Sequence, residues 1–391
     1  MKRMLCVVLC VMIVLASLSA LASCGKGDGT DDIEFVETPY KGTKLYVYNW
    51  GENIADGSDG SVDIVKKFEK KYGIDVIYTT YASNEEMYTL LAGGGVNYDV
   101  VIPSDYMIAR LISEGLLQKL DFSNIPNYQN IAEEYRSMYY DQGGEGGAAE
   151  YSVPYTVGMV GVVYNTKYVD EADVAKKSWD LLWNQKYAGK ILTINNSRDA
   201  FGISMFYLQN MDVNSKNPDD WQKAYDALVA QRPVLKGYYM DEVFDEMEGE
   251  NAYIGTYYAG DCLTMMDENE NLAFYYPEEG TNIFVDAMCI PTCAKNKGAA
   301  ELFINFMLEK EWAIENSLYI YYASPNKLVR EDAEYKKKLG DDYYNYLYSY
   351  PASYLNEDGT LNTKKVQYYY DLDRDTKDLL ATLWDRLKAA N

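Results

Sequence analysis

The chain has 391 residues, a formal charge of −24 at neutral pH and no histidine. A surface this acidic repels nucleic acid and favours cationic partners. The lack of histidine removes the commonest general base and the commonest zinc ligand. Tyrosine is in unusual excess, with 40 residues against 6 Trp and 10 Phe.

The first residues have the pattern of a secretion signal. Two basic residues precede an apolar run at 4–21, which is near the lower length limit for a membrane-spanning helix. The run leads into Leu-Ala-Ser-Cys-Gly at 21–25, which resembles a bacterial lipobox. We therefore expect 1–23 to be a signal peptide, Cys24 to be lipidated and held on the membrane by two acyl chains, and 24–43 to be a flexible tether.

From residue 44 onward, strand patterns alternate with helix patterns. Strands are predicted at 44–50, 74–81 and 98–103, where β-branched and aromatic residues gather. Helices with apolar residues at helical spacing follow them, at 61–72, from an Asn84 cap to Gly93, and at 106–114. This order predicts a parallel, doubly wound sheet, with ligand groups beyond the carboxyl ends of its strands.

A glycine-rich break at 142–147 precedes a second series of α/β elements. Strand-like segments lie at 151–155, around Tyr164, at 191–194, at 252–258 and at 286–290, and helices carry Trp179, Trp221 and the amphipathic segment 299–308. The chain beyond the tether is long enough for two lobes, and no second apolar stretch is long enough to span a membrane.

Cysteine usage gives no sign of a metal site. Beyond the signal segment and Cys24, the chain has Cys262, Cys289 and Cys293. An odd number leaves two possibilities open, one disulfide with a free thiol or three buried thiols. No paired C-x-x-C spacing is present, and we expect neither a metal nor a cofactor.

A series of short segments is similar to the spermidine/putrescine-binding proteins of bacterial ABC importers. The matching segments lie at 48–52, 100–106, 151–155, 196–201, 258–261, 276–280, 286–291 and 324–326. Each is short, but their order and spacing together are specific to that family. The resemblance implies the α/β type II periplasmic-binding-protein fold, with two doubly wound lobes joined by a hinge. It places 44–153 and 287–391 in one lobe, 154–286 in the other and ligand in the cleft.

The resemblance also implies a set of ligand-binding residues. A polyamine needs carboxylates for its ammonium groups and aromatic faces for its methylenes. On the first lobe's side of the cleft these are Trp50, Glu52, Ser104 and Tyr106; on the second lobe's side they are Asp199, Tyr258, Asp261, Phe284 and Asp286, with Tyr322 as a further aromatic and Gln367 as a further polar contact.

Each of these residues also has a structural interpretation. Trp50 and Tyr258 can be core aromatics, Asp199 can follow a helix cap and Asp261 can be a turn residue. Asp286 precedes an apolar strand, where a buried carboxylate without a partner is costly, so it is the strongest ligand candidate. The family often has an acidic residue where Asn196 stands, so the choice between putrescine and spermidine stays open.

The resemblance therefore implies a monomeric binding protein that delivers polyamine to the membrane permease of an ABC importer and is not an enzyme. We expect it on the outer face of the cell membrane, in the periplasm where the cell has an outer membrane. Two alternatives remain. A protein of the same fold can capture ferric iron through phenolates and carboxylates, and an extracellular hydrolase can use paired carboxylates.

Overall fold

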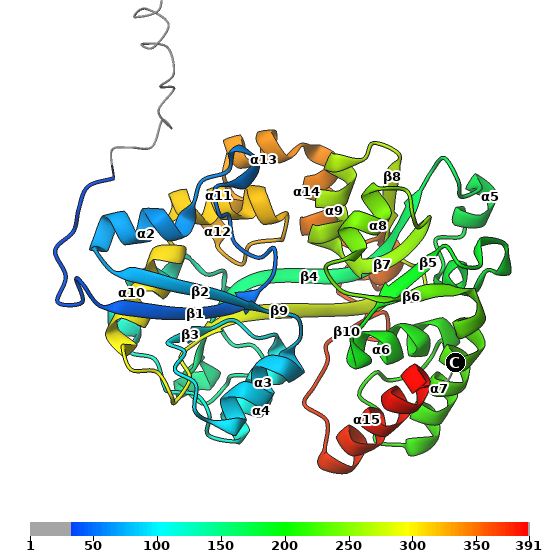
Figure 1. Ribbon diagram of the computed structural model, residues 1–391, viewed down its shortest axis with the longest axis horizontal. Helices are drawn as coiled ribbons and strands as arrows, with labels where there is room; N and C mark the ends of the chain where they lie inside the picture. Colours follow the sequence, from blue (N-terminus) through cyan, green and yellow to red (C-terminus); the bar gives the residue numbers. More distant parts are fainter. Residues whose placement is uncertain (1–32, 390–391) are drawn as a thin grey trace, which may run out of the picture.

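The computed structural model describes residues 33–389, so the predicted signal peptide and Cys24 lie outside the described residues. Within this range, no helix combines the length and apolar character needed to cross a membrane. The fold is mixed α/β, with helices above and below one continuous sheet that runs through both halves of the molecule (Figure 1).

The first lobe follows the alternation predicted from the sequence. β1 (Lys44–Trp50) pairs in parallel with β2 (Asp75–Tyr81) and with β3 (Val100–Val101). The connecting helices are α2 (Ile64–Tyr72), α3 (Asn84–Gly93) and α4 (Asp105–Ser113). Parallel pairing brings the carboxyl ends of β1 and β3 to the same edge, and this edge faces the site described below.

The start of α3 differs from the prediction by one residue, with a consequence for the site. Ser83, not Asn84, caps α3, because its hydroxyl accepts from the backbone N–H of Glu86. The Asn84 side chain is buried and accepts from the N–H of Ser104 at 3.2 Å instead. Asn84 thus helps to position the first residues of α4.

Two long strands connect the lobes. β4 (Ser152–Asn165) and β9 (Thr281–Cys289) pair antiparallel, and the sheet order is β2-β1-β3-β9-β4-β7-β5-β6. β8 (Leu272–Tyr275) pairs with β4, and the short β10 (Val366–Gln367) pairs with β9. The sheet is therefore mixed rather than wholly parallel, because both crossing strands run antiparallel to their main neighbours (Figure 1).

In the second lobe, the sheet continues beyond β4 through β7, β5 and β6 in that order. β5 (Ile191–Ile194) lies parallel to β6 (Leu235–Tyr239) and to β7 (Ile254–Tyr258). The helices of this lobe are α5 (Glu171–Val174), α6 (Ser197–Leu208), α7 (Pro218–Gln231), α8 (Val243–Glu248) and α9 (Ala259–Glu268). β6 was not predicted from the sequence, and its carboxyl end contributes to the site.

The remaining helices cover the sheet. They are α10 (Lys297–Met307), α11 (Lys310–Ile320), α12 (Lys327–Arg330), α13 (Ala333–Leu339), α14 (Asp341–Tyr348) and α15 (Arg374–Ala389). Short 3-10 helices occupy Ser58–Gly60, Phe122–Asn124, Pro126–Asn130, Glu133–Tyr135, Glu145–Gly147, Trp179–Trp183, Gln185–Tyr187, Arg232–Val234 and Ala352–Tyr354. The apolar face predicted for 299–308 is real: Phe303 and Phe306 of α10 pack against Phe68 of α2, with ring centroids 5.1 and 5.4 Å apart.

The C-terminal helix packs on the second lobe. α15 contacts α6 and α7 (Figure 1), although the sequence-based division places 287–391 with the first lobe. The lobe boundaries stay a prediction, and this packing argues for counting α15 with the second lobe. The three cysteines of the described chain are free thiols, with Cys262 and Cys289 buried and Cys293 partly exposed.

Candidate functional site

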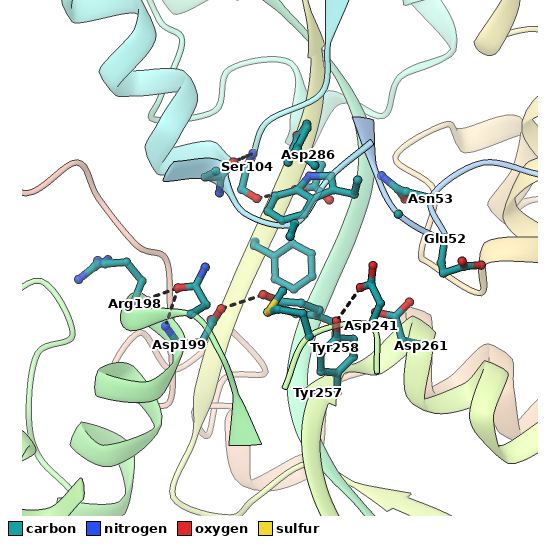
Figure 2. A pocket seen from close by; sticks show the side chains of 18 of the residues that line it. Glu52, Asn53, Ser104, Arg198, Asp199, Asp241, Tyr257, Tyr258, Asp261 and Asp286 are labelled. Atoms are coloured by element: carbon teal, nitrogen blue, oxygen red, sulfur yellow. Dashed lines mark hydrogen bonds between the residues drawn. The ribbon is translucent and has the colours of Figure 1, made fainter. Parts of the chain in front are cut away.

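A cavity lies between the lobes where strand ends from both of them meet. It encloses about 720 Å³, counting the space of its open mouth. Ten of the eleven ligand-binding residues predicted from the sequence line it: Trp50, Glu52, Ser104, Tyr106, Asp199, Tyr258, Asp261, Phe284, Asp286 and Tyr322. Figure 2 shows Asp286 and Ser104 on one wall, Asp199 at one side, and Asp241, Asp261 and Glu52 at the other.

Asp286 is the buried carboxylate of the crossing strand β9. Its two oxygens accept from Ser104 Oγ at 2.7 Å and from Thr156 Oγ1 at 2.8 Å. Ser104 is the N-cap residue of α4 but makes no side-chain capping bond, because its hydroxyl is turned to Asp286. Burial raises the pKa of Asp286 to about 6, although both hydroxyl hydrogen bonds lower it.

Asp199 occupies the first turn of α6. The N-cap Asn196 accepts from the backbone N–H groups of Arg198 and Asp199, which fixes the start of the helix. The Tyr258 hydroxyl donates to Asp199 Oδ2 at 2.8 Å. Burial raises the pKa of Asp199 to about 6, opposed by the Tyr258 hydrogen bond and the positive charge of Arg198.

Asp261 occupies the first turn of α9. It is 8% exposed, and the Tyr322 hydroxyl donates to its Oδ2 at 2.8 Å. Burial raises the pKa of Asp261 well above its usual value, and the negative charges of Asp241, Glu52 and Asp286 raise it further. An empty site therefore holds this carboxylate at a cost that a bound cation relieves.

Aromatic rings line the cavity between these carboxylates. The Trp50 indole N–H donates to the carbonyl of Ile102, which sets the ring at the end of β1. Phe284 lies 5.3 Å from Tyr258 between ring centroids, in an edge-to-face arrangement. Phe284 fits here because its cross-strand partner is Gly158, where an added Cβ would come within 2.5 Å of its ring.

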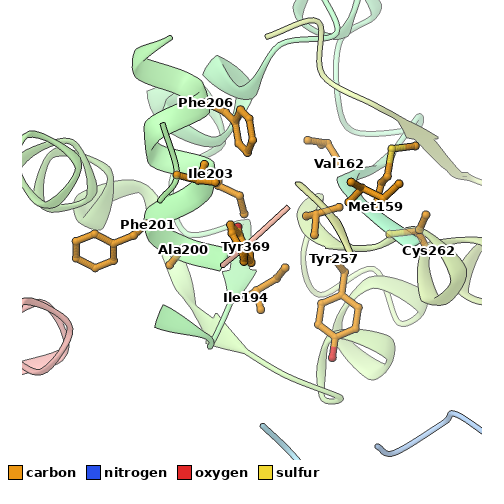
Figure 3. Close-up of a cluster of buried hydrophobic side chains, with 14 of the residues drawn as sticks. Met159, Val162, Ile194, Ala200, Phe201, Ile203, Phe206, Tyr257, Cys262 and Tyr369 are labelled. Carbon is orange, nitrogen blue, oxygen red and sulfur yellow. The ribbon is translucent and has the colours of Figure 1, made fainter. Parts of the chain in front are cut away.

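The second-lobe wall of the cavity is the edge of a hydrophobic core. Tyr257 and Tyr369 line the cavity and also belong to the cluster that Ile194, Phe201 and Met159 help to form (Figure 3). The packing of this core holds the wall in place. The polar groups of the wall therefore lose little conformational freedom when ligand binds.

Charge is strongly unbalanced in the cavity. Six carboxylates line it, namely Glu52, Asp105, Asp199, Asp241, Asp261 and Asp286, whereas Arg198 is the single cation among the described lining residues. Arg198 donates to the carbonyl of Val213 and to Asn214, and its guanidinium lies 4.4 Å from the ring centroid of Tyr369. The site is thus suited to a ligand with several positive charges.

Sequence reasoning missed several lining residues, including Asn84, Asp105, Arg198, Asp241, Tyr257, Asn282 and Tyr369. Asp105 and Arg198 are direct neighbours of predicted residues, so the motifs that contain them could have indicated them. Asp241 follows β6, the strand that the sequence pattern did not reveal. Gln367 does not line the cavity, because its side chain bonds to backbone groups of Met211 and Val213.

Comparison with known proteins identifies the family. Residues 63–340 match the model of the bacterial extracellular solute-binding proteins. The chain belongs to this family. The spermidine/putrescine-binding periplasmic protein of Escherichia coli is 30% identical over 338 residues, which cover 84% of this chain and 91% of that protein. The resemblance predicted from the sequence is confirmed.

Solved structures of similar solute-binding proteins share the fold. One from Listeria monocytogenes, named for spermidine/putrescine ABC transport, has a TM-score of 0.76 and 30% identity, covering 89% of this chain and 99% of that one. The spermidine/putrescine substrate-binding protein of Streptococcus pneumoniae has a TM-score of 0.67 and 33% identity, covering 88% and 98%. The two-lobed fold predicted from the sequence is likewise confirmed.

Proposed function

We propose that this protein binds a polyamine in the interlobe cavity and delivers it unchanged to the permease of an ABC importer. The observation that carries the proposal is the set of buried carboxylates that alternate with aromatic rings around one cavity. The names of the similar proteins from Escherichia coli and Streptococcus pneumoniae support the same ligand class.

The chemistry of the cavity suits such a ligand. Asp199 and Asp261 each accept from a tyrosine hydroxyl, which leaves further acceptor positions on each carboxylate for an ammonium group. The faces of Trp50 and Phe284 offer contact to methylenes and to cations. Charge-assisted hydrogen bonds at fixed positions then select a cationic chain of suitable length.

Ferric iron is a poorer fit to this cavity. Iron capture by tyrosine uses phenolates, whereas burial raises the pKa of Tyr106, Tyr258 and Tyr322 well above the usual value. Among residues 33–389, no three His, Cys, Asp or Glu side chains gather closely enough to hold a metal ion. We therefore favour an organic cation.

We further propose that the protein acts as a lipid-anchored monomer outside the cell membrane. The family is extracellular, and the sequence around Cys24 supports lipidation. Cys24→Ala removes the acyl acceptor, so the exported variant should leave the detergent phase in a phase-partition assay that retains the wild type. Equal partitioning of both would contradict the anchor.

The ligand is tested by calorimetric titration of the purified protein with putrescine, spermidine and ferric citrate. We expect saturable binding of at least one polyamine and none of iron. Asp261→Asn serves as the site control, because it keeps the shape of the side chain and removes one cavity charge. Iron binding without polyamine binding would replace the proposal by its alternative.

A further inference from the structure

The cavity mouth carries a carboxylate that no family motif of the sequence includes. Asp241 lies in the loop between β6 and α8 and lines the cavity. Its Oδ1 accepts from the hydroxyl of the buried Tyr257 at 3.2 Å. Because Tyr257 belongs to the core of the second lobe, this bond fixes the Asp241 side chain toward the cavity (Figure 2).

Asp241 reaches across the cleft to the first lobe. A Cβ added at Gly51 would come within 2.6 Å of Asp241 Oδ2, so the carboxylate lies against the backbone at the end of β1. The next residue of that loop is Glu52, which also lines the cavity. Glycine at position 51 therefore lets carboxylates from opposite lobes meet at one end of the cavity.

The two ends of the cavity differ in charge. At one end, burial and the negative charge of Glu85 raise the pKa of Asp199, whereas the positive charge of Arg198 lowers it. At the other end, Asp241 and Glu52 both lie within electrostatic reach of Asp261, and no lysine or arginine lines this end in the described chain. A diamine offers one ammonium to each end, which leaves the more acidic end with excess negative charge.

From this asymmetry we propose that Asp241 is a specificity-determining residue that pairs with an additional cationic group, so that the site prefers a triamine to a diamine. The inference rests on the proposed polyamine function. Asp261 and Glu52 hold the ammonium group that a diamine also has, and Asp241 adds the second-lobe carboxylate for the next cation of a longer ligand. Because Asp241 is exposed, its contribution is smaller than that of a buried carboxylate.

The test compares Asp241→Asn with the wild type by titration with spermidine and putrescine. We expect spermidine affinity to fall by about fivefold or more and putrescine affinity to change by less than about twofold, as loss of one partly screened charge pair predicts. Asp245→Asn is the matched control, since it removes the same charge from an exposed residue one turn along, outside the cavity. It should leave both affinities unchanged.

Acetylated ligands distinguish the effect of ligand charge on affinity from the effect of ligand length. The two monoacetylspermidines keep the spermidine chain, and each lacks one terminal cation. One isomer lacks the cation that faces Asp241, so its interaction with Asp241 is already lost in the wild type. Asp241→Asn should therefore have no effect on the affinity of that isomer. It should still weaken the other isomer.

The outcomes distinguish this inference from the proposed function. A wild type that binds no polyamine would overturn the proposed function and the inference with it. A wild type that binds both ligands, with equal losses or no loss in Asp241→Asn, would overturn the inference alone. A loss of the same size in Asp245→Asn would also overturn it, because the effect would then be long-range charge rather than a contact.

Discussion

Asp286 is buried, and a substitution that removes only its charge can test its role in ligand binding. Asp286→Asn keeps the shape that Ser104 and Thr156 contact but removes the charge. A charge-assisted hydrogen bond contributes roughly 1.5–3 kcal/mol, so we expect polyamine affinity to fall by about one to two powers of ten. Without ligand, the variant should fold at least as well as the wild type at pH 7, because an ionised buried carboxyl is costly.

Thermal melts with and without ligand decide between this role and a structural one. If Asp286 only stabilises the fold, Asp286→Asn should melt earlier and keep its normal ligand-induced rise in melting temperature. Asp261→Asn provides an independent second case, since its carboxylate bonds to Tyr322 on another element. A normal rise in both variants would exclude these carboxylates from the site.

The buried carboxyls also predict a pH dependence. The pKa values of Asp199 and Asp286 rise from 3.8 to about 6 in the folded, empty protein. Between these values the folded state binds more protons than the unfolded state, so this contribution to stability is greatest at low pH and is lost as pH rises through about 6. Ligand affinity depends on pH in the opposite direction and rises with pH, because a bound ammonium group favours the ionised carboxylates.

We therefore expect polyamine affinity to fall as the pH decreases from 7 to 5, with about one to two protons released per ligand bound near pH 5.5. The amines stay protonated throughout this range, so the change belongs to the protein. Calorimetry in buffers of different ionisation enthalpy measures the released protons. Affinity that is constant across the range would contradict the raised pKa values.

Individual site residues were predictable where a motif carried them. Trp50, Asp261 and Asp286 lie in segments that the sequence already associated with the family, and all three line the cavity. Asp241 was not predictable, because its place depends on the length of β6 and on a hydrogen bond from Tyr257, which lies on β7, two strands away in the sheet. A contact between lobes, such as that of Asp241 with Gly51, has no local signal in a sequence.

At the level of elements, the crossing strands were only partly predictable. The sequence indicated short segments at 151–155 and 286–290, whereas β4 has 14 residues and β9 has nine. Most residues of β4 and all of β9 are buried, so the alternation that marks a half-exposed strand is absent. The first lobe was easier, since its strands and helices alternate with glycine between them.

The segment after β10 bonds to Asn214 of the second lobe and makes a further contact with the first lobe. The Tyr139 ring lies between Tyr368 and Tyr370, with centroids 5.4 and 4.5 Å away, and its hydroxyl donates to the Tyr369 carbonyl. Tyr139→Ala should destabilise the close approach of the lobes and weaken all polyamines by a common factor of about three to thirty, since binding then includes the cost of closure.

Calorimetry with two polyamines checks this expectation. A common loss fits a change in lobe approach, whereas a loss confined to one ligand would show that Tyr139 acts on the ligand itself. Tyr139→Phe keeps the ring contacts and removes only the hydroxyl, so it should produce a smaller loss than Tyr139→Ala. Equal losses would assign the effect to the hydrogen bond alone.

For the whole molecule, the arrangement of lobes predicts motion. β4 and β9 carry most of the connection between the lobes, and a pair of strands can bend where pairing is irregular, as between Pro154 and Thr156. Carboxylates facing one another across the cleft repel when it is empty, which favours separation of the lobes. A bound polycation reverses this repulsion and joins Glu52 of the first lobe to Asp199 and Asp261 of the second lobe.

Small-angle X-ray scattering should therefore show a smaller radius of gyration with saturating polyamine than without it. Asp261→Asn is the informative variant, because less repulsion across the cleft should make its ligand-free radius smaller than that of the wild type. Magnesium chloride at matched ionic strength controls for general screening, which acts on exposed charges but much less on buried ones. If the radius is unchanged while calorimetry confirms saturation, the lobes are already closed before the ligand binds, and repulsion between the cavity carboxylates does not set their separation.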